Sequence, residues 1–389
     1  MKAVLAILLI LLLFSNCTTS LPATPSPEII GELQFTDDYT VGGMVVEIDG
    51  QRYLLLMTTE SPAVPSKATL HVLDLEDPAS PLEVGRLAAP EDSLLVRFEP
   101  ALSDMVLYAP IVGSDWMGLW VVDISEPVSP QEITRLDVGL FTTDLVISGN
   151  TSYLTGGFSP GRFSIIDISD PEKPGLIGDF RLSRERHVKG HSYDIEISGS
   201  FLYTVDRAGL DIVDISSPTS PLEVGFYANP LWENEELDVV EPGVIIKTEE
   251  FDPEDWPPDG FQDIAVSGQY AYIAAGKAGL RVLDVHDPAS PQEVAQLNIE
   301  DTATNVVVSH NLLYLLTMGW PENDIGQGSR MLYNVHVIDI SEPASPKIVG
   351  SVEIIMPPLM PATLVASDTY VYLLTYTNIL VIDIYGSGG

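Results

Sequence analysis

One short pattern recurs seven times in this chain and constrains its fold more than any other feature. Each copy contains an apolar pentapeptide close to Leu-x-Val-x-Asp, and the first six copies continue into a Pro-containing stretch. The copies are LHVLD from Leu70, LWVVD from Leu119, FSIID from Phe163, LDIVD from Leu210, LRVLD from Leu280, VHVID from Val335 and ILVID from Ile379. Their aspartates are Asp74, Asp123, Asp167, Asp214, Asp284, Asp339 and Asp383, separated by 44 to 70 residues. A repeat of about 40–50 residues is typical of the blades of a β-propeller.

Four strands fit within one unit. An apolar segment at 144–147 ends in a Ser-Gly-Asn turn and is followed by a second strand at 152–155. The pentapeptide forms a third strand, and the Pro-rich turn at 77–81 leads into a fourth strand at 82–87. We name these strands A to D, from the inner to the outer edge of a blade. No long segment has a helical period, so we predict an all-β, seven-bladed β-propeller of four-stranded antiparallel blades.

The two ends of the chain predict how the ring closes. The seventh copy ends at Gly389 without a D strand, whereas residues 28–33 (EIIGEL) resemble the D strand at 82–87 (LEVGRL). A strand supplied from the N-terminus would complete the last blade and remove an open sheet edge. Residues 28–389 are therefore expected to form a single propeller.

The seven pentapeptides resemble the signature of the LVIVD-repeat family, and the resemblance covers nearly all of residues 28–389. The resemblance implies a bacterial or archaeal surface β-propeller. It implies no established activity and no catalytic residue.

The first 27 residues have the character of an export signal and a tether. Lys2 precedes an apolar run at 3–14, and the only cysteine of the chain, Cys17, follows it. This segment resembles a bacterial lipoprotein signal, although Asn16 and Phe14 depart from the usual residues before the lipidated cysteine. We predict a signal peptide at 1–17 with lipidation of Cys17, and a Ser/Thr/Pro tether at 18–27; simple secretion is the alternative. The protein is then extracytoplasmic, at the cell surface or membrane-anchored, and touches the membrane only through its lipid.

The charge of the chain excludes some partners. It has 56 Asp and Glu against 18 Lys and Arg, a net charge of −38. Nucleic acid attracts basic surfaces, so we expect no nucleic-acid partner. Docking to anionic lipid through a basic patch is disfavoured for the same reason.

The variable loops predict where a partner binds. The A–B and C–D turns share one end of the ring and are short, whereas the B–C and D–A loops share the other end and vary. The variable segments are 111–117, 157–161, 181–192, 228–261 and 318–333. Loops on a rigid scaffold commonly carry function. The acidic insertion at 228–261 could bind calcium, but its spacing does not match a D-x-[DN]-x-[DN]-G loop, and a solvated acidic insertion is the alternative.

Aromatic and histidine side chains gather in these loops. The predicted ligand-binding face contains Trp116, His187, His191, Trp232, Trp256 and Trp320. Exposed aromatics suit protein or glycan recognition; alternatively, they cap blade ends. The two histidines could share a metal, but no third ligand is indicated, so no metal site and no cofactor is predicted.

A second candidate site lies at the centre of the ring. Strands A are expected to begin with Asp144, Asp194, Asp263 and Asn305, which would surround the mouth of the central channel. They could form a polar collar for a cation or a small ligand. Alternatively, each side chain bonds nearby backbone where the loop ends. The seven repeat aspartates are expected to be structural and to accept hydrogen bonds from the following turn.

The expected function is a monomeric binding or scaffold module that recognises protein or glycan through the B–C/D–A loop face. The chain has no G-x-S-x-G, H-E-x-x-H or P-loop motif, so no catalytic residue is predicted. The alternative is an extracytoplasmic hydrolase or lyase at the channel mouth, because a carboxylate pair could assemble there. A structural envelope protein is the third reading.

Overall fold

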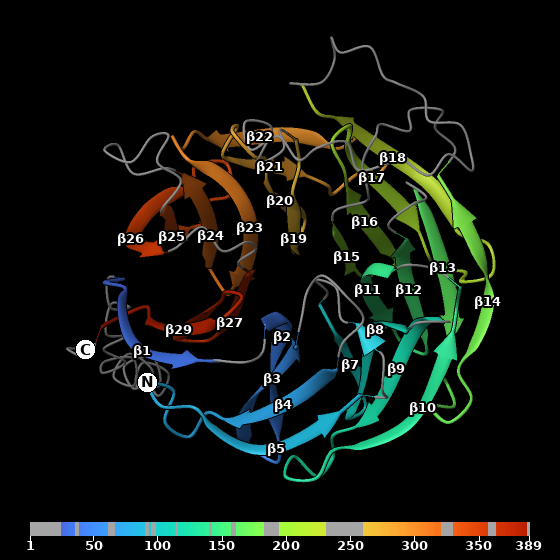
Figure 1. Ribbon diagram of the computed structural model, residues 1–389. Helices are drawn as coiled ribbons and strands as arrows, with labels where there is room; N and C mark the ends of the chain where they lie inside the picture. The colour runs from blue at the N-terminus through green and yellow to red at the C-terminus, as the bar shows by residue number, and fades with distance from the viewer. Residues whose placement is uncertain are drawn as a thin grey trace, which may run out of the picture.

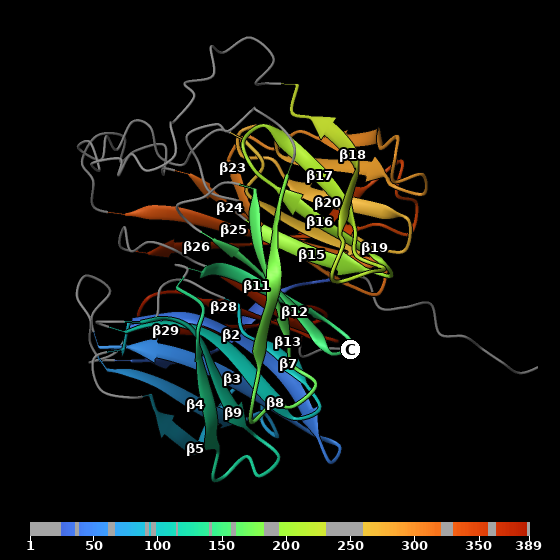
Figure 2. The same ribbon diagram turned by 90° about the vertical axis from the view of Figure 1, so that its right-hand side faces the viewer.

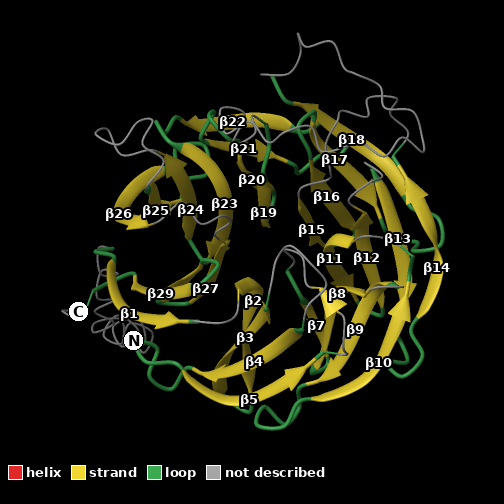
Figure 3. Ribbon diagram, viewed as in Figure 1, coloured by secondary structure: helices red, strands yellow, loops and turns green. Residues whose placement is uncertain are grey.

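A computed structural model places the chain in a ring of seven sheets (Figure 1). It describes residues 25–35, 39–60, 67–89, 93–94, 99–113, 116–139, 142–156, 161–182, 194–230, 260–319, 330–356 and 363–386. Every regular element in these ranges is a strand (Figure 3). The described part contains no helix long and apolar enough to cross a membrane.

Each blade consists of four consecutive positions, A to D. Blade 1 is β2 (Tyr39–Ile48), β3 (Gln51–Thr59), β4 (Ala68–Asp74) and β5 (Leu82–Ala88). Blade 2 has a divided A strand, β6 (Ser93–Leu94) and β7 (Ala101–Ser103), followed by β8 (Val106–Gly113), β9 (Met117–Asp123) and β10 (Gln131–Asp137). Blade 3 is β11 (Thr142–Ser148), β12 (Thr151–Gly156), β13 (Arg162–Asp167) and β14 (Gly175–Arg181). Blade 4 is β15 (Asp194–Ser198), β16 (Phe201–Val205), β17 (Gly209–Asp214) and β18 (Leu222–Ala228).

The remaining blades follow the same order. Blade 5 is β19 (Asp263–Ser267), β20 (Tyr270–Ala274), β21 (Leu280–Asp284) and β22 (Gln292–Leu297). Blade 6 is β23 (Thr302–Ser309), β24 (Leu312–Gly319), β25 (Met331–Asp339) and β26 (Lys347–Met356). Blade 7 is β27 (Thr363–Ser367), β28 (Tyr370–Leu374) and β29 (Asn378–Asp383), with β1 (Glu28–Gln34) as its D strand. The predicted seven-bladed fold is confirmed.

The hydrophobic core lies between blades rather than within one sheet. Each of the seven apolar clusters among the described residues combines side chains of two neighbouring blades. Between blades 7 and 1, for example, Leu54 and Leu73 pack with Tyr372 and Ile379. Both faces of strands B and C are buried in this way, which explains why the pentapeptides are nearly continuous apolar runs rather than alternating ones.

The repeat aspartates are structural, as predicted. In all seven copies, the carboxylate accepts a hydrogen bond from the backbone N–H two residues later, at 2.7–3.0 Å. This is the Asx-type contact that begins a turn. The aspartate therefore ends strand C and starts the turn into strand D.

Glycines of the outer strands hold neighbouring blades together at the rim. A Cβ on Gly225 of blade 4 would lie 1.8 Å from the carbonyl oxygen of Pro288, in the C–D turn of blade 5. Gly85 of blade 1 approaches Pro127 of blade 2 in the same way, with a corresponding distance of 2.1 Å. These positions accept the next blade's turn only because glycine has no side chain.

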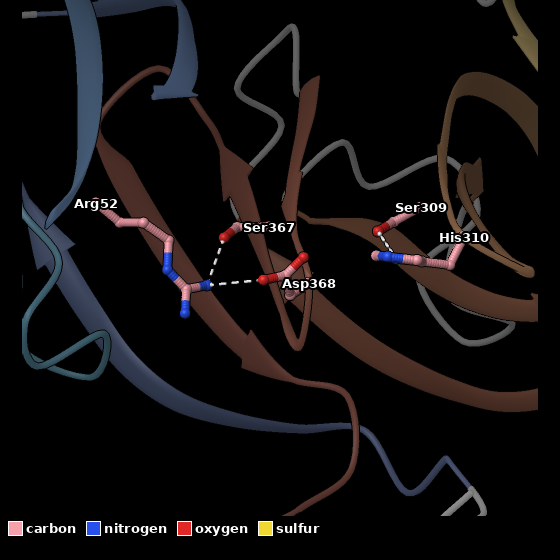
Figure 4. A network of polar contacts seen from close by, with 5 residues as sticks. All are labelled: Arg52, Ser309, His310, Ser367 and Asp368. Atoms are coloured by element: carbon pink, nitrogen blue, oxygen red, sulfur yellow. Dashed lines mark hydrogen bonds and ion pairs between the residues drawn. The ribbon is translucent and has the colours of Figure 1, made fainter. Parts of the chain in front are cut away.

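The ring closes through the N-terminal strand, also as predicted. Strand β1 pairs antiparallel with β29, from Glu28 opposite Asp383 to Gln34 opposite Asn378. On the turn side of the same junction, the Arg52 guanidinium donates to Ser367 Oγ at 3.1 Å and lies 3.4 Å from Asp368 Oδ2 (Figure 4). The Arg52–Asp368 pair joins blades 1 and 7 but is largely exposed, so it stabilises the junction only weakly.

Some predicted boundaries were wrong. Strands β11 and β23 begin at Thr142 and Thr302 rather than at Asp144 and Asn305, because a register shift precedes each of those two residues. The segment 111–117 is mostly strand, since Val112 pairs with Met117 and leaves 114–116 as the connection. Likewise, β24 ends at Gly319 and β25 begins at Met331, so both strands reach into the segment expected as a loop at 318–333.

Candidate functional site at the channel mouth

A cavity of about 420 Å³ lies at the centre of the ring. Its walls come from the A strands of blades 1 to 6, including Val146, Ala265 and Val307. Carboxyl and amide groups of Glu99, Asp144, Asp194, Glu196, Asp263 and Asn305 also line it. No lysine, arginine or histidine is among the lining residues. The cavity therefore combines apolar walls with an acidic mouth.

Strand register defines the collar more completely than the sequence pattern did. In every blade, a tyrosine of strand B pairs with the A-strand residue two positions after the collar residue, as Tyr153 pairs with Val146 in blade 3. Equivalent collar residues are Met44, Glu99, Asp144, Asp194, Asp263, Asn305 and Thr363. Each lies nine positions before its tyrosine, for example Glu99 before Tyr108. Sequence reasoning missed Glu99 because the A strand of blade 2 is divided, but the constant spacing to the tyrosine identifies it.

The four predicted collar residues form a chain of hydrogen bonds from blade to blade. Asp144 accepts from the backbone N–H of Ile195 in the next blade at 3.0 Å, and Asp194 accepts from Ile264 at the same distance. Asp263 continues the chain by accepting from the N–H of Val306 at 2.7 Å.

Asn305 ends this chain. Its side-chain amide donates to Asp263, and its carbonyl oxygen accepts from the N–H of Leu364 at 2.8 Å. The collar side chains bond to backbone, as the alternative to a ligand-binding collar expected. These bonds reach the backbone of the neighbouring blade and not only the adjacent loop. Each bond gives a hydrogen-bond acceptor to a backbone N–H at the inner edge of the next blade. The chain of bonds therefore links blades 3 to 7.

Burial favours the protonated form of the collar carboxyl groups. Desolvation in the ring centre, together with the nearby charge of Glu99, raises the pKa of Asp144 to about 8. The pKa of Asp194 is also raised by burial and by the negative charge of Asp144. Neighbouring carboxyl groups cannot all ionise at low cost, so part of the collar is protonated near neutral pH.

Glu196 is the exception among the channel walls. It occupies the position one residue past the buried Ile195, where the other six blades have Val46, Ala101, Val146, Ala265, Val307 and Val365. Burial, together with the charges of Glu99 and Asp263, raises the pKa of Glu196 to about 8. Blade 4 therefore places one additional carboxyl group in the channel.

Trp116 lies at the B–C end of blade 2, on the side of the ring where the A strands begin. It is partly buried against the cluster shared by blades 1 and 2, and the Arg135 guanidinium lies 5.9 Å from its ring centroid. An arginine over an indole face is a cation–π arrangement. One edge of Trp116 is packed and the other is partly accessible. It therefore has features both of a cap on a blade end and of an exposed binding residue.

Most other predicted site residues lie outside the described ranges. They are Cys17, His187, His191, Trp232, Trp256 and Trp320, together with nearly all of the acidic insertion at 228–261. Within the described ranges, no group of three or more His, Cys, Asp or Glu side chains is arranged to hold a metal ion.

Comparison with known proteins supports the repeat assignment and the fold. The model of the LVIVD repeat matches residues 108–138, 141–181, 189–229, 261–298 and 334–354. A search of curated proteins gave no match. Among solved structures, the chain is similar to the computationally designed Ika8 protein, with a TM-score of 0.51 at 10% identity, over 92% of this chain and 100% of that one. At this identity, the likeness concerns the fold alone.

Proposed function

Since the chain belongs to the LVIVD-repeat family and folds as a seven-bladed propeller, we propose that it is an extracytoplasmic, surface-anchored binding module. It recognises a protein or a glycan through the face formed by its B–C and D–A loops. LVIVD repeats on a propeller suggest a binding or scaffold module in general. The face and the anchoring at Cys17 are the specific parts of this proposal.

The connection lengths of the blades support the choice of face. Every A–B turn has two residues, and every C–D turn has seven, as between Asp74 and Leu82. The B–C connections instead range from three residues in blade 7 to eleven in blade 6, and the connection from β18 to β19 has 34. The turn side therefore presents seven similar A–B turns and six similar C–D turns, whereas the loop side differs from blade to blade. A specific partner needs a surface of the second kind.

The channel supports a second candidate, a hydrolase or lyase. The raised pKa of Glu196 in a cavity of about 420 Å³ is the feature that a general acid would need. Against this, the oxygens of Asp144 are already used by backbone amides, from Leu145 at 2.7 Å and from Ile195. Carboxylates committed to holding blades together are poorly placed to act on a substrate, so we favour the binding module.

Mutations on the two faces test the proposal. The full chain and its variants would be applied to a glycan array and to an extract of envelope proteins from the producing cell. We expect Trp116→Ala, combined with Trp→Ala at 232, 256 or 320, to weaken binding at least tenfold, because aromatic anchors concentrate interface energy. The matched turn variants Pro81→Ala and Pro130→Ala should lower stability and leave binding unchanged. Binding that is lost in the turn variants and retained by all three double tryptophan variants would refute the choice of face.

A further inference from the structure

We propose that the turn-side rim of blades 6, 7, 1 and 2 rests on the lipid bilayer that holds the anchor, and that the exposed apolar side chains of Ile348, Ile29, Leu82 and Val128 contact the headgroup region. This inference rests on the proposed anchoring through Cys17. It deepens the proposed function, because it directs the loop face away from the membrane. It also departs from the expectation that the protein touches the membrane only through its lipid, since it adds a contact made by the rim.

The N-terminal segment joins the ring at its turn side. The N–H of Ser26 donates to the carbonyl of Ile384 at 2.9 Å, and Glu28 pairs with Asp383, at the end of strand C where the turn begins. Strands A and C of a blade run in the same direction, so Asp383 lies on the side of the A–B turns, such as the one joining β15 to β16 (Figure 2). Seven residues lie between Cys17 and Pro25, so the two are at most about 30 Å apart. A lipid on Cys17 therefore keeps this side of the ring close to the bilayer.

Exposed apolar side chains form an arc around this point. Leu82 and Val128 are 67% and 66% exposed, and Ile29 and Ile348 are each 44% exposed. All four lie at the beginning of a D strand or in a C–D turn. Apolar side chains with this much exposure are candidates for contact with a membrane or another apolar surface.

Rim contacts make the arc continuous across four blades. Gly350, two residues after Ile348, faces Pro27 of the entering segment. Gly31, two residues after Ile29, faces the backbone of Ala79 in the turn that leads to Leu82.

The last contact of the series reaches blade 2. Gly85, three residues after Leu82, faces Pro127 and Val128. Apolar side chains of similar exposure also lie on the rim of blades 3 and 4, at Leu176 and Leu222. The four residues of blades 6, 7, 1 and 2 lie on both sides of the segment that carries the tether, which is why we assign this part of the rim to the bilayer.

The charge of the protein determines which bilayer fits. The chain carries a net charge of −38, and turn residues near the arc include the exposed Glu76, Asp77 and Glu126. An anionic surface would repel this rim, whereas a zwitterionic surface would accept its apolar side chains. The proposal therefore concerns apolar contact with a net-neutral bilayer.

Hydrogen exchange on the tethered protein tests the inference. The mass of the Cys17 peptide first shows whether the residue is acylated. Acylated full chain is reconstituted into phosphatidylcholine vesicles; if the thiol is free, the same full chain is coupled through this single cysteine to a maleimide-headgroup lipid in those vesicles. The reference is Cys17→Ser full chain in buffer without vesicles. We expect amides at 76–81 and 125–130 to exchange at least about threefold more slowly on vesicles, and amides of the loop side at 116–118 to be unchanged.

Matched variants separate apolar contact from simple proximity. The double variant Leu82→Ser/Val128→Ser should lose this protection. The control Leu176→Ser/Leu222→Ser, at rim positions of blades 3 and 4 that are 51% and 62% exposed, should keep it. Equal exchange with and without vesicles, protection on the loop side, or protection that appears without vesicles as protein concentration rises would overturn the proposal. The last result would indicate a second copy as the occupant. An unmodified Cys17 would contradict the proposed anchoring alone, since the coupled protein still reports on the rim.

Discussion

Replacing Gly225 with alanine should weaken the contact between blades 4 and 5. A Cβ at this position would lie 1.8 Å from the carbonyl oxygen and 2.9 Å from the carbonyl carbon of Pro288. Both atoms belong to the backbone of a seven-residue turn, so neither can rotate away as a side chain would. Gly178 of blade 3 provides the matched control, because a Cβ there would meet no atom within 4 Å.

The two substitutions should change the free energy of unfolding in different directions. At Gly225, the turn of blade 5 must move by more than 1 Å to restore an ordinary contact distance, and overpacking of this kind costs about 1–3 kcal/mol. At Gly178 there is no clash, and alanine in a strand interior is favoured over glycine by roughly 0.5–1 kcal/mol. The free energy of unfolding should therefore fall for Gly225→Ala and stay level or rise for Gly178→Ala.

Chemical denaturation of the two variants, followed by circular dichroism, measures the difference. Limited proteolysis gives a local readout, since cleavage in the turn at 285–291 should increase for Gly225→Ala only. Equal stability of the two variants would refute the argument that outer-strand glycines hold the rim through close backbone approach.

Three further predictions follow from the inner ring and its closure. Asp144→Ala should lower the free energy of unfolding by about 1–3 kcal/mol, because it leaves the N–H of Ile195 without its acceptor. Asp144→Asn, which places at this position the residue found at Asn305, should lower the free energy of unfolding by less. Equal losses for the two variants in urea denaturation would argue against the inter-blade bond. Because the folded pKa values of Asp144 and Glu196 lie near 8, above their ordinary values, their contribution to stability is complete in acid and is lost as pH rises through about 8. The melting temperature of Glu196→Gln should therefore fall less between pH 6 and pH 9 than that of the wild type, with exposed Glu47→Gln as the control, and parallel pH profiles would contradict the assignment. Deleting residues 18–34 should lower the melting temperature and open β29 to protease, because β29 loses its outer partner β1 and becomes an edge strand. Unchanged melting would show that β1 does not close the ring.

The sequence predicted the fold well because the repeat carries its own structural signals. The pentapeptide aspartates mark the end of strand C in all seven blades, and the similarity of residues 28–33 to 82–87 predicted closure through β1. The period, the turn residues and the apolar runs all indicate the same architecture, and such agreement is the usual condition for a unique fold.

The channel was less predictable. Asp144, Asp194, Asp263 and Asn305 were identified as a group, but their bonds to the next blade depend on the stagger between sheets, which no local pattern contains. Glu99 was missed because the A strand of blade 2 is divided into β6 and β7, so the inner strand of this blade was not aligned with the others. Glu196 was missed because its significance appears only when its equivalents in the other blades are aligned through the strand B tyrosines.

Mapping the bound face by hydrogen exchange tests the central claim most directly. The full chain would be measured alone and in complex with the tightest-binding glycan or envelope protein found in the binding screen. Recognition through the loop face predicts slower exchange around Trp116 and at the ends of the strands that border the B–C and D–A loops, with the A–B and C–D turns unchanged. Protection confined to those turns, or to the channel strands around Asp194 and Glu196, would contradict it.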